Sequence, residues 1–297
     1  MGDVLSLRLL RYAACLLLAC VGALVVAVPV LGRTAAVTMV GAGDIAYCGG
    51  DRDAATARLV RRIPGTVFTL GDNVYDRGTA REFRNCYDPT WGTFKKRTKP
   101  SVGNHEYYTR GAAPYYDYFG RKAGPRGKGY YSYDRGAWHV VVLNSNCDRV
   151  GCGPRSAQVA WLRADLSRNP ARCTLAYFHH PLFSSNAPSR DVRTFWQVLY
   201  NRRADVILAG HAHAYERFHP MRPDGTRAPK RGIRSFVVGT GGKPPERPFD
   251  PRPANLVVRN DKTPGVLRLT LRSGSYSWKF VPVAGKTFTD SGRGVCH

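Results

Sequence analysis

The fold of this chain is decided by the stretch Thr66-Val67-Phe68-Thr69-Leu70-Gly71-Asp72-Asn73-Val74-Tyr75, an apolar run of strand length that ends abruptly in a polar cluster. Four other runs end in the same way, at residues 36–42, 138–143, 174–178 and 205–209. Parallel strands that alternate with helices deliver functional side chains at their carboxyl ends. The periodicity therefore predicts an α/β fold with polar residues gathered at one end of its strands.

The segments between these runs have helical periodicity. Apolar residues recur on one helical face in three stretches, which are residues 51–63, 156–166 and 192–203. Further along, we expect a strand at 235–238 and a hairpin at 266–283 that turns at Ser273-Gly274. Residues 107–131 are rich in Tyr, Gly and Arg without periodicity, so we expect long loops there, and the Pro-, Lys- and Arg-rich stretch 242–253 is another expected loop.

The chain begins with a targeting segment. Arg8 and Arg11 precede an apolar run from Ala13 to Leu31, which at about 19 residues exceeds the core of an ordinary signal peptide and reaches the length that can span a bilayer. We expect residues 1–36 to be a signal peptide cleaved near Ala36, with a retained signal-anchor as the alternative. Residues 37–297 would then be one domain that is secreted or extracellular, or anchored on the outer face of a membrane.

The charge balance favours anionic partners. The chain carries 45 Lys and Arg against 21 Asp and Glu, a formal net charge of +24. Such a charge attracts polyanions and anionic surfaces, and it says nothing about the fold. Because the basic residues are scattered, a compositional bias toward arginine is an equal alternative to a polyanion-binding surface. Contact with a membrane is expected only if the leader is retained.

Six cysteines follow the leader, an even number that indicates disulfides in an oxidising compartment. The sequence has no Cys-x-x-Cys pair, which argues against a zinc–thiolate site. Six cysteines allow fifteen pairings. In the pairing that we favour as a hypothesis, one disulfide closes a short Gly-containing loop, and the other four cysteines form two more. The pairs are Cys147–Cys152, Cys48–Cys86 and Cys173–Cys296.

The polar clusters together carry the donors of a two-metal site. Each donor follows a predicted strand or lies in its loop, and the set is Asp44, Asp72, Tyr75, Asn104, His179, His211 and His213. Hard oxygen donors and imidazoles without site thiols suit Fe, Zn and Mn. Two such cations can bind a phosphoryl group, lower the pKa of a bridging water and stabilise the leaving oxygen. A capping or core role would explain any one of these residues, but not their joint pattern.

In order along the chain, these segments resemble the calcineurin-like metallophosphoesterase superfamily, and within it the purple acid phosphatases. Ala46 stands where most of the superfamily has the histidine of an Asp-x-His motif, and Tyr75 stands at the phenolate position of Gly-Asp-x-x-Tyr. Residues 210–217, Gly-His-Ala-His-Ala-Tyr-Glu-Arg, are similar to the last motif. The resemblance covers about residues 37–297. It implies a four-layer αββα sandwich of two mixed β-sheets flanked by helices, with a dinuclear metal site at the strand C-terminal ends.

The resemblance also implies a role for each donor. A ferric ion, Fe(III), would take Asp44, Asp72, Tyr75 and His213. A divalent metal (Zn, Fe or Mn) would take Asp72, Asn104, His179 and His211, with Asp72 as the bridge. His105 would be the catalytic residue, a charge-stabilising donor or proton carrier beside the phosphoryl group. Of the nearby residues, His180 would be a packed neighbour, and Glu106 and Glu216 would anchor hydrogen bonds behind the ligands.

We therefore expect a secreted, metal-dependent phosphoric ester hydrolase of the acid-phosphatase type, in which a metal-activated hydroxide attacks phosphate monoesters directly and in line. Plant-type members carry two histidines where this chain has Pro188 and Ser189, which leaves the pH optimum and the leaving-group proton donor open. One alternative is a phosphodiesterase or nucleotide-hydrolysing metallophosphoesterase, because tyrosines in 107–118 either stack on a leaving group or pack within their loops. Another is a catalytically idle basic protein that binds polyanions.

Overall fold

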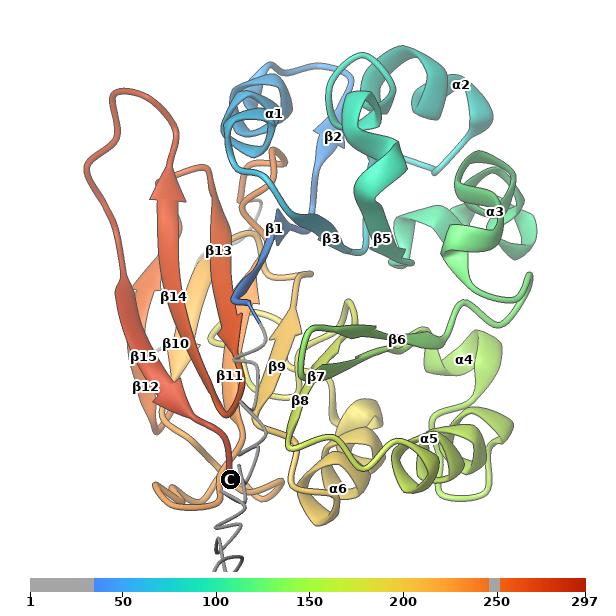
Figure 1. The fold of residues 1–297 in the computed structure, drawn as a ribbon. Coiled ribbons are helices and arrows are strands. Elements are labelled where there is room, and N and C mark those ends of the chain that lie inside the picture. Colours follow the sequence, from blue (N-terminus) through green and yellow to red (C-terminus); the bar gives the residue numbers. More distant parts are fainter. Residues whose placement is uncertain (1–34, 246–251) are drawn as a thin grey trace, which may run out of the picture. The chain divides into compact units, whose positions relative to one another are not determined.

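The computed structural model describes residues 35–245 and 252–297. The predicted leader, apart from Ala35 and Ala36, and the middle of the predicted loop 242–253 lie outside this part of the chain. The described residues form two large β-sheets, one of six strands and one of seven. Helices cover their outer sides (Figure 1). A third sheet has two strands.

The six-stranded sheet has the order β15-β14-β13-β1-β3-β5. Its parallel strands are β1 (Val37–Ala42), β3 (Thr66–Leu70) and β5 (Thr98–Ser101). Its antiparallel strands are β13 (Gly265–Arg272), β14 (Ser275–Pro282) and β15 (Ser291–Val295). Every residue of β3 is buried, as expected for a strand that is covered on both faces.

The seven-stranded sheet has the order β12-β10-β11-β9-β8-β7-β6. Its parallel strands are β7 (Trp138–Val142), β8 (Cys173–Tyr177), β9 (Val206–Ala209) and β11 (Arg234–Val238). Its antiparallel strands are β6 (Tyr131–Arg135), β10 (Tyr215–Phe218) and β12 (Leu256–Asn260). The two-stranded sheet pairs β2 (Ala46–Tyr47) with β4 (Val74–Tyr75), beyond the ends of β1 and β3.

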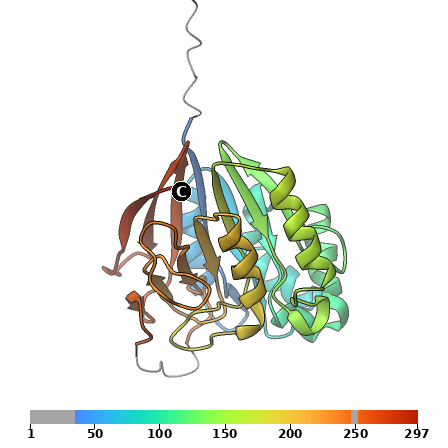
Figure 2. The same cartoon turned by 90° about the horizontal axis from the view of Figure 1, so that it is seen from below.

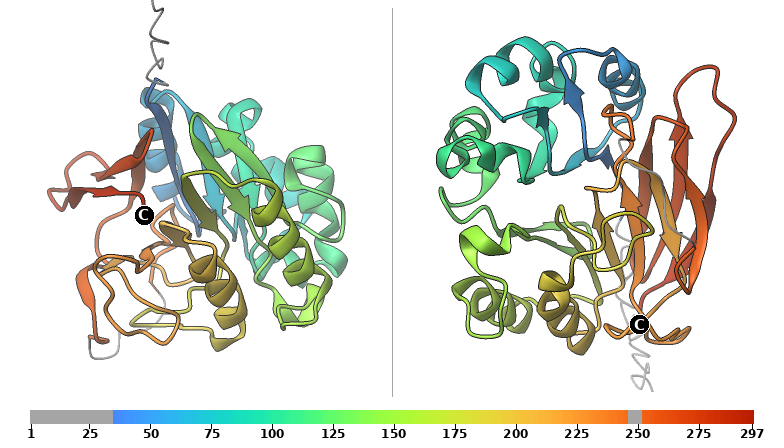
Figure 3. Two further views of the ribbon diagram at one scale, coloured as in Figure 1. Left: turned by 60° about the horizontal axis from the view of Figure 1, so that its bottom comes forward. Right: turned by 180° about the vertical axis from the view of Figure 1, so that it is seen from behind.

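Helices form the outer layers. The α-helices are α1 (Arg52–Arg62), α2 (Ala80–Glu82), α3 (Ala113–Phe119), α4 (Cys147–Val150), α5 (Ala157–Arg168) and α6 (Arg193–Asn201). The shorter or irregular helices are η1 (Phe83–Tyr87), η2 (Trp91–Arg97), η3 (His105–Tyr108), η4 (Arg110–Ala112), η5 (Gly120–Ala123) and η6 (Arg190–Val192). In Figures 2 and 3, α5 and α6 lie together on the outer face of the seven-stranded sheet.

The two large sheets pack face to face through aromatic side chains. Phe68 on β3 lies 6.0 Å from Tyr177 on β8, and Phe236 on β11 lies 5.4 Å from Trp278 on β14, measured between ring centroids. A second core lies between the seven-stranded sheet and its helices, where Phe195 on α6 contacts Phe178. Helix, sheet, sheet and helix therefore form four layers, which confirms the predicted αββα sandwich.

The strongly periodic segments were predicted well. The structure confirms the three helices and all the predicted strands to within about three residues. The hairpin of β13 and β14 turns at Ser273-Gly274, as predicted. The prediction of long loops for residues 107–131 was wrong, since this segment contains helix α3. Tyr115 and Phe119 lie one helical turn apart there and are both buried in the core, so packing stabilises a helix that has no regular apolar pattern.

The three predicted disulfides are confirmed, as Cys48–Cys86, Cys147–Cys152 and Cys173–Cys296. The last of these ties the C-terminal residues to the start of β8, 123 positions earlier in the chain. Closing so long a loop restricts the unfolded chain and so stabilises the fold. Within the described residues, no helix has both the length and the apolar character that a membrane crossing requires.

His139 forms a buried ion pair in this fold. Its Nδ1 lies 2.8 Å from Asp134 Oδ1 and its Nε2 lies 2.8 Å from Asp165 Oδ2. Burial disfavours protonation of His139, but the hydrogen bonds and charges of the two aspartates outweigh burial and raise its pKa above 6.5. The protonated pair therefore stabilises the fold fully below the unfolded-state pKa, and this stabilisation is lost as the pH rises through the raised pKa.

We expect His139→Gln to lower the free energy of unfolding by about 2 kcal/mol at pH 5.5, because two hydrogen bonds to a charged group are lost. The difference from the unsubstituted protein should shrink as the pH is raised to 9. Urea unfolding at both pH values measures it. A difference that does not change between the two pH values would contradict this account of the pair.

Candidate metal centre

The topology brings loops from both large sheets to one place. Asp44 and Asp72 follow β1 and β3, and Asn104 lies beyond β5, all in the six-stranded sheet. His179 and His211 follow β8 and β9 in the seven-stranded sheet. Because the side chains from the two sheets contact one another, the parallel strands of both sheets must point toward the same end of the domain.

The first donor set surrounds the hydroxyl of Tyr75. Its Oη lies 2.9 Å from Asp44 Oδ1, 3.0 Å from Asp72 Oδ2 and 3.2 Å from His213 Nε2. A phenol has a single proton, so it cannot donate to both carboxylates at once. All four atoms can offer a lone pair, and the other three lie within 3.2 Å of the phenol oxygen. A cation fits such a set better than protein hydrogen bonds do.

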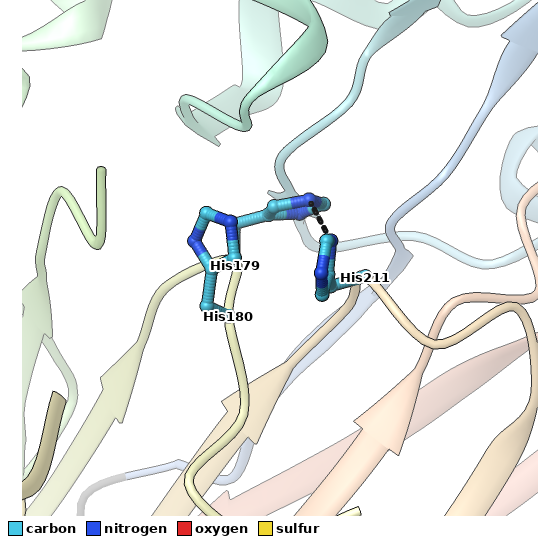
Figure 4. Close-up of side chains that lie close together, drawn as sticks. All are labelled: His179, His180 and His211. Carbon is cyan, nitrogen blue, oxygen red and sulfur yellow. Dashed lines mark hydrogen bonds between the residues drawn. The ribbon is translucent and has the colours of Figure 1, made fainter. Parts of the chain in front are cut away.

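The second donor set surrounds the imidazole of His179. Its Nε2 lies 3.0 Å from Asn104 Oδ1, 3.2 Å from Asp72 Oδ2 and 3.2 Å from His211 Nδ1. Figure 4 shows His179 and His211 meeting edge-on at this contact, with His180 beside them. The same Asp72 oxygen approaches both Tyr75 and His179, so the two sets share one carboxylate atom.

Hydrogen bonds behind the site orient the imidazole lone pairs. His179 Nδ1 donates to the carbonyl oxygen of Leu70 (2.7 Å), and His213 Nδ1 donates to that of Pro244 (2.8 Å). The proton on each Nδ1 leaves a lone pair on Nε2, which faces the donor set. Metal-binding histidines are commonly fixed in this way. The tautomers that the structure favours are therefore those that a metal requires.

The two aspartates favour positive charge between the donors. Burial disfavours a charged His179, yet Asp72 and Asp44 outweigh burial and raise the pKa of His179 to about 9. Burial likewise disfavours a charged Asp72, but His179 and His105 lower its pKa below the usual value. Burial and both aspartates raise the pKa of Tyr75 far above 10. The two carboxylates thus favour protons on His179 and Tyr75, at the places where two cations would fit.

Backbone strain marks the same positions. Asp44 (φ 59°), Asp72 (φ 46°) and His211 (φ 69°) are in the left-handed region, which costs a residue with a side chain about 1 kcal/mol or more. Gly71 before Asp72 also has positive φ (81°), and a β-carbon there would lie 2.5 Å from His179 Nδ1. The tight turn before Asp72 therefore requires glycine at position 71.

His105 lies beside the donors but not among them. Its backbone N–H donates to Asp72 Oδ1 (2.9 Å), and its Nε2 lies 3.9 Å from Asp72 Oδ2. Its Nδ1 donates to the carbonyl oxygen of Asp76 (2.6 Å), and its ring lies 4.3 Å from that of Tyr75 between centroids. His105 is thus held at the mouth of the centre.

Two buried glutamates support the loops. Glu106 accepts N–H hydrogen bonds from Asn73 and Gly103, both at 2.7 Å, so one carboxylate ties the loop after β3 to the loop after β5. Glu216 accepts the N–H of Ser185 (3.0 Å) and so fixes the loop that follows His179. Both glutamates thus lie behind the donors, as expected.

A cavity of about 360 Å³ opens over the two donor sets. Besides Asp72, Asn104, His105, His211 and His213, its lining comes from Tyr108, Asn186 and Ala187. No motif marks Asn186 or Ala187 in the sequence, because both lie in an irregular loop. Pro188 and Ser189 are not among the lining residues.

The tyrosines of 107–118 were expected either to stack on a leaving group or to pack within their loops. The rings of Tyr115 and Tyr116 are buried in the core, whereas Tyr108 is 53% exposed on the cavity wall. His180 is half-buried and remains outside the cavity lining, with Ser145 Oγ 2.9 Å from its Nδ1. Of the five tyrosines of 107–118, Tyr108 alone lines the cavity, and the other four lie outside its lining.

Comparisons with known proteins agree with this geometry. A family model described as calcineurin-like phosphoesterase matches residues 37–215. The chain is 28% identical over 193 residues to a probable purple acid phosphatase 20 of Arabidopsis thaliana, covering 54% of this chain and 43% of that protein. It is 31% identical over 212 residues to a phosphoenolpyruvate phosphatase of Allium cepa, covering 60% of this chain and 43% of that protein. The chain thus spans less than half the length of these relatives.

A solved structure shows the same fold. The purple acid phosphatase isolated from yellow lupin (Lupinus luteus) seeds superposes with a TM-score of 0.69 at 17% identity. The match covers 88% of this chain and 54% of that one. The two-sheet sandwich described here is therefore shared with that protein.

We expect Glu106→Gln to weaken metal retention about 10- to 100-fold, because an amide cannot accept N–H hydrogen bonds at both of its ends. The loops that carry Asp72 and Asn104 would then separate. Elemental analysis after dialysis against a weak chelator measures the loss. Asp117→Asn, a substitution of an exposed carboxylate that pairs with Arg126, is the control and should retain metal. Full metal content in the Glu106 variant would contradict the supporting role.

Proposed function

The chain belongs to the calcineurin-like phosphoesterase family, and we propose from this premise that it is an exported phosphomonoesterase with a dinuclear metal centre of the purple acid phosphatase type. The observation that carries the proposal is the shared oxygen of Asp72, which lies 3.0 Å from Tyr75 Oη and 3.2 Å from His179 Nε2. A single carboxylate atom between two donor sets suits a pair of bridged cations.

The two donor sets differ in chemistry, and this difference suggests two different metals. The set with a phenol, Asp44, Asp72, Tyr75 and His213, suits Fe(III). The set with an amide and two imidazoles, Asp72, Asn104, His179 and His211, suits a divalent ion such as Zn, Fe or Mn. When bound, such a pair lowers the pKa of water and neutralises the charge of a phosphoryl group.

Protein residues would orient the ester and handle its proton. His105 lines the cavity, and its Nδ1 donates to the backbone carbonyl oxygen of Asp76. A protonated Nε2 could therefore donate toward a phosphoryl oxygen or the leaving group. Among the described residues, no Ser, Thr or Cys lines the cavity, and Asp72, His211 and His213, which do, belong to the donor sets. We therefore propose direct in-line hydrolysis without a phosphoenzyme.

A phosphodiesterase is the second candidate, and a specific observation favours it. Tyr108 presents an exposed ring at the cavity wall, and its centroid lies 4.7 Å from that of His105. An aromatic or nucleoside group on the second side of a diester could stack there.

Export is supported by the cysteines. Three disulfides join all six cysteines of the described residues, and disulfides persist in oxidising compartments outside the cytosol. We propose that the domain acts on the outer side of a membrane, either released or anchored.

We expect p-nitrophenyl phosphate to be hydrolysed at least about tenfold faster, in kcat/KM, than bis-p-nitrophenyl phosphate, because two metals bind a dianionic monoester best. Asp72→Asn should lower both rates by about three orders of magnitude, since it weakens both metal sites. Steady-state kinetics of the two esters decide the matter. Faster turnover of the diester would overturn the monoesterase assignment and support the diesterase.

A second prediction concerns the ferric ion. We expect the purified protein to absorb visible light, through charge transfer from the Tyr75 phenolate to Fe(III), and Tyr75→Phe to abolish this band. Tyr47→Phe, a substitution of the residue that pairs with Tyr75 in the two-stranded sheet, should leave the band intact. An active, colourless protein would rule out the ferric assignment.

A further inference from the structure

The domain has two functionally different ends. Donors from both large sheets meet at the carboxyl ends of the parallel strands, so the amino ends of these strands share the opposite end. We call this opposite end the strand-start end. It is defined by the five residues that precede each of β3, β5, β7, β8, β9 and β11, which are residues 61–65, 93–97, 133–137, 168–172, 201–205 and 229–233.

The strand-start end is strongly basic. Its six segments contain twelve Lys or Arg residues and only two acidic residues, Asp134 and Asp205. The five residues that follow the same six strands contain a single basic residue, Lys243, together with Asp72 and Glu106. Beside the ends of these six strands, the positive charge therefore lies mainly at the end away from the metal centre.

The two acidic residues of this end are engaged with histidines. Asp134 lies 2.8 Å from His139, and Asp205 lies 3.1 Å from His297. Among the residues that the structure describes, none of the twelve cations forms an ion pair with a carboxylate. The positive charge of this end is thus largely uncompensated.

Local structure accounts for only part of this charge. Seven of the twelve cations lie at helix C-termini, where the helix dipole favours cations: Arg61, Arg62, Lys95, Lys96, Arg97, Arg168 and Arg202. Arg97 donates hydrogen bonds to carbonyl oxygens beyond α1, including that of Gly65 at 2.8 Å. By contrast, Arg172 is exposed and lies outside any helix. The basic end is therefore more than a set of helix caps.

The chain enters the sandwich at this same end. β1 starts at Val37 in parallel register with β3, and Gly136 of the strand-start end lies against Val37 and Ala35. Figure 2 shows β1, in blue, starting beside the β6–β7 hairpin, in green. The apolar run from Ala13 to Leu31 ends four positions before Ala35, and four extended residues span at most about 14 Å.

We propose that the strand-start end docks on the anionic head groups of a phospholipid bilayer in which the apolar run 13–31 is retained as an anchor. The anchor would hold the basic end within about two Debye lengths of the lipid surface, where attraction between cations and anionic lipids is effective. Docking turns the metal centre away from the bilayer, toward soluble esters. The other polyanion to consider is nucleic acid, but the position of the chain entrance favours a bilayer.

The test is amide hydrogen exchange of the full chain reconstituted in vesicles. One vesicle preparation contains phosphatidylcholine alone, and the other contains 30% phosphatidylglycerol. We expect exchange in segments 168–172 and 201–205 to be at least about threefold slower in the anionic vesicles. Segments 105–112 and 184–189 at the metal end should not change. The protection should be lost in 0.5 M NaCl, because salt screens the attraction.

Two matched variants separate this surface from total charge. Arg62, Arg168, Arg172 and Arg202, all exposed at the strand-start end, are replaced together by Gln in the first. Arg58, Arg81, Arg84 and Arg155, all exposed elsewhere, are replaced together by Gln in the second. The first variant should lose the protection and the second should keep it. Both should hydrolyse a soluble monoester at the unsubstituted rate, so a loss of activity would not be confused with a loss of docking.

Equal exchange of the strand-start segments in both vesicle types would overturn the proposal, whatever the variants do. Protection by single-stranded DNA in detergent solution, with none from anionic vesicles, would also overturn it and would assign the surface to nucleic acid. If the first variant does not fold, the salt dependence of the unsubstituted protein still decides between docking and its absence.

Discussion

The rest of the structure depends on one carboxylate oxygen that serves two donor sets. Asp72 Oδ2 lies near the phenol of Tyr75 on one side and near the imidazole of His179 on the other. Two sets that share an atom cannot move apart independently, so the loops of both sheets must meet within hydrogen-bond distance. The face-to-face packing of the sheets, the tight turns and the buried Glu106 all serve this single requirement.

Meeting this requirement costs stability, which the surrounding structure recovers. Three of the seven donors lie in the left-handed backbone region, and several buried charged groups are brought together. The aromatic core between the sheets and the long-range disulfide from Cys173 to Cys296 stabilise the sandwich from outside the site. The strained donors lie at the carboxyl ends of the strands, and Arg203 (φ 60°) is, among the described residues, the one non-glycine residue of the strand-start segments in the same backbone region.

Much of the fold and the site could be predicted from the sequence, for physical reasons that differ by element. Strand β3 was located at its residues because a strand covered on both faces is a continuous apolar run. Helix α3 and the short strand β5 could not be located, because tertiary burial and not local periodicity stabilises them. The seven donors could be selected by their types and positions, but their division into two sets came from a family resemblance. Asn186 had no local signal, because it reaches the cavity through an irregular loop.

The central claim is that Asp72 bridges two metal ions, and the measurement that tests it most directly is a crystal structure with anomalous diffraction recorded above and below the iron and zinc absorption edges. The account predicts two anomalous peaks, one beside Tyr75 and His213 and one beside Asn104 and His211, both within coordination distance of Asp72. A single peak, or two peaks of which only one contacts Asp72, would contradict it.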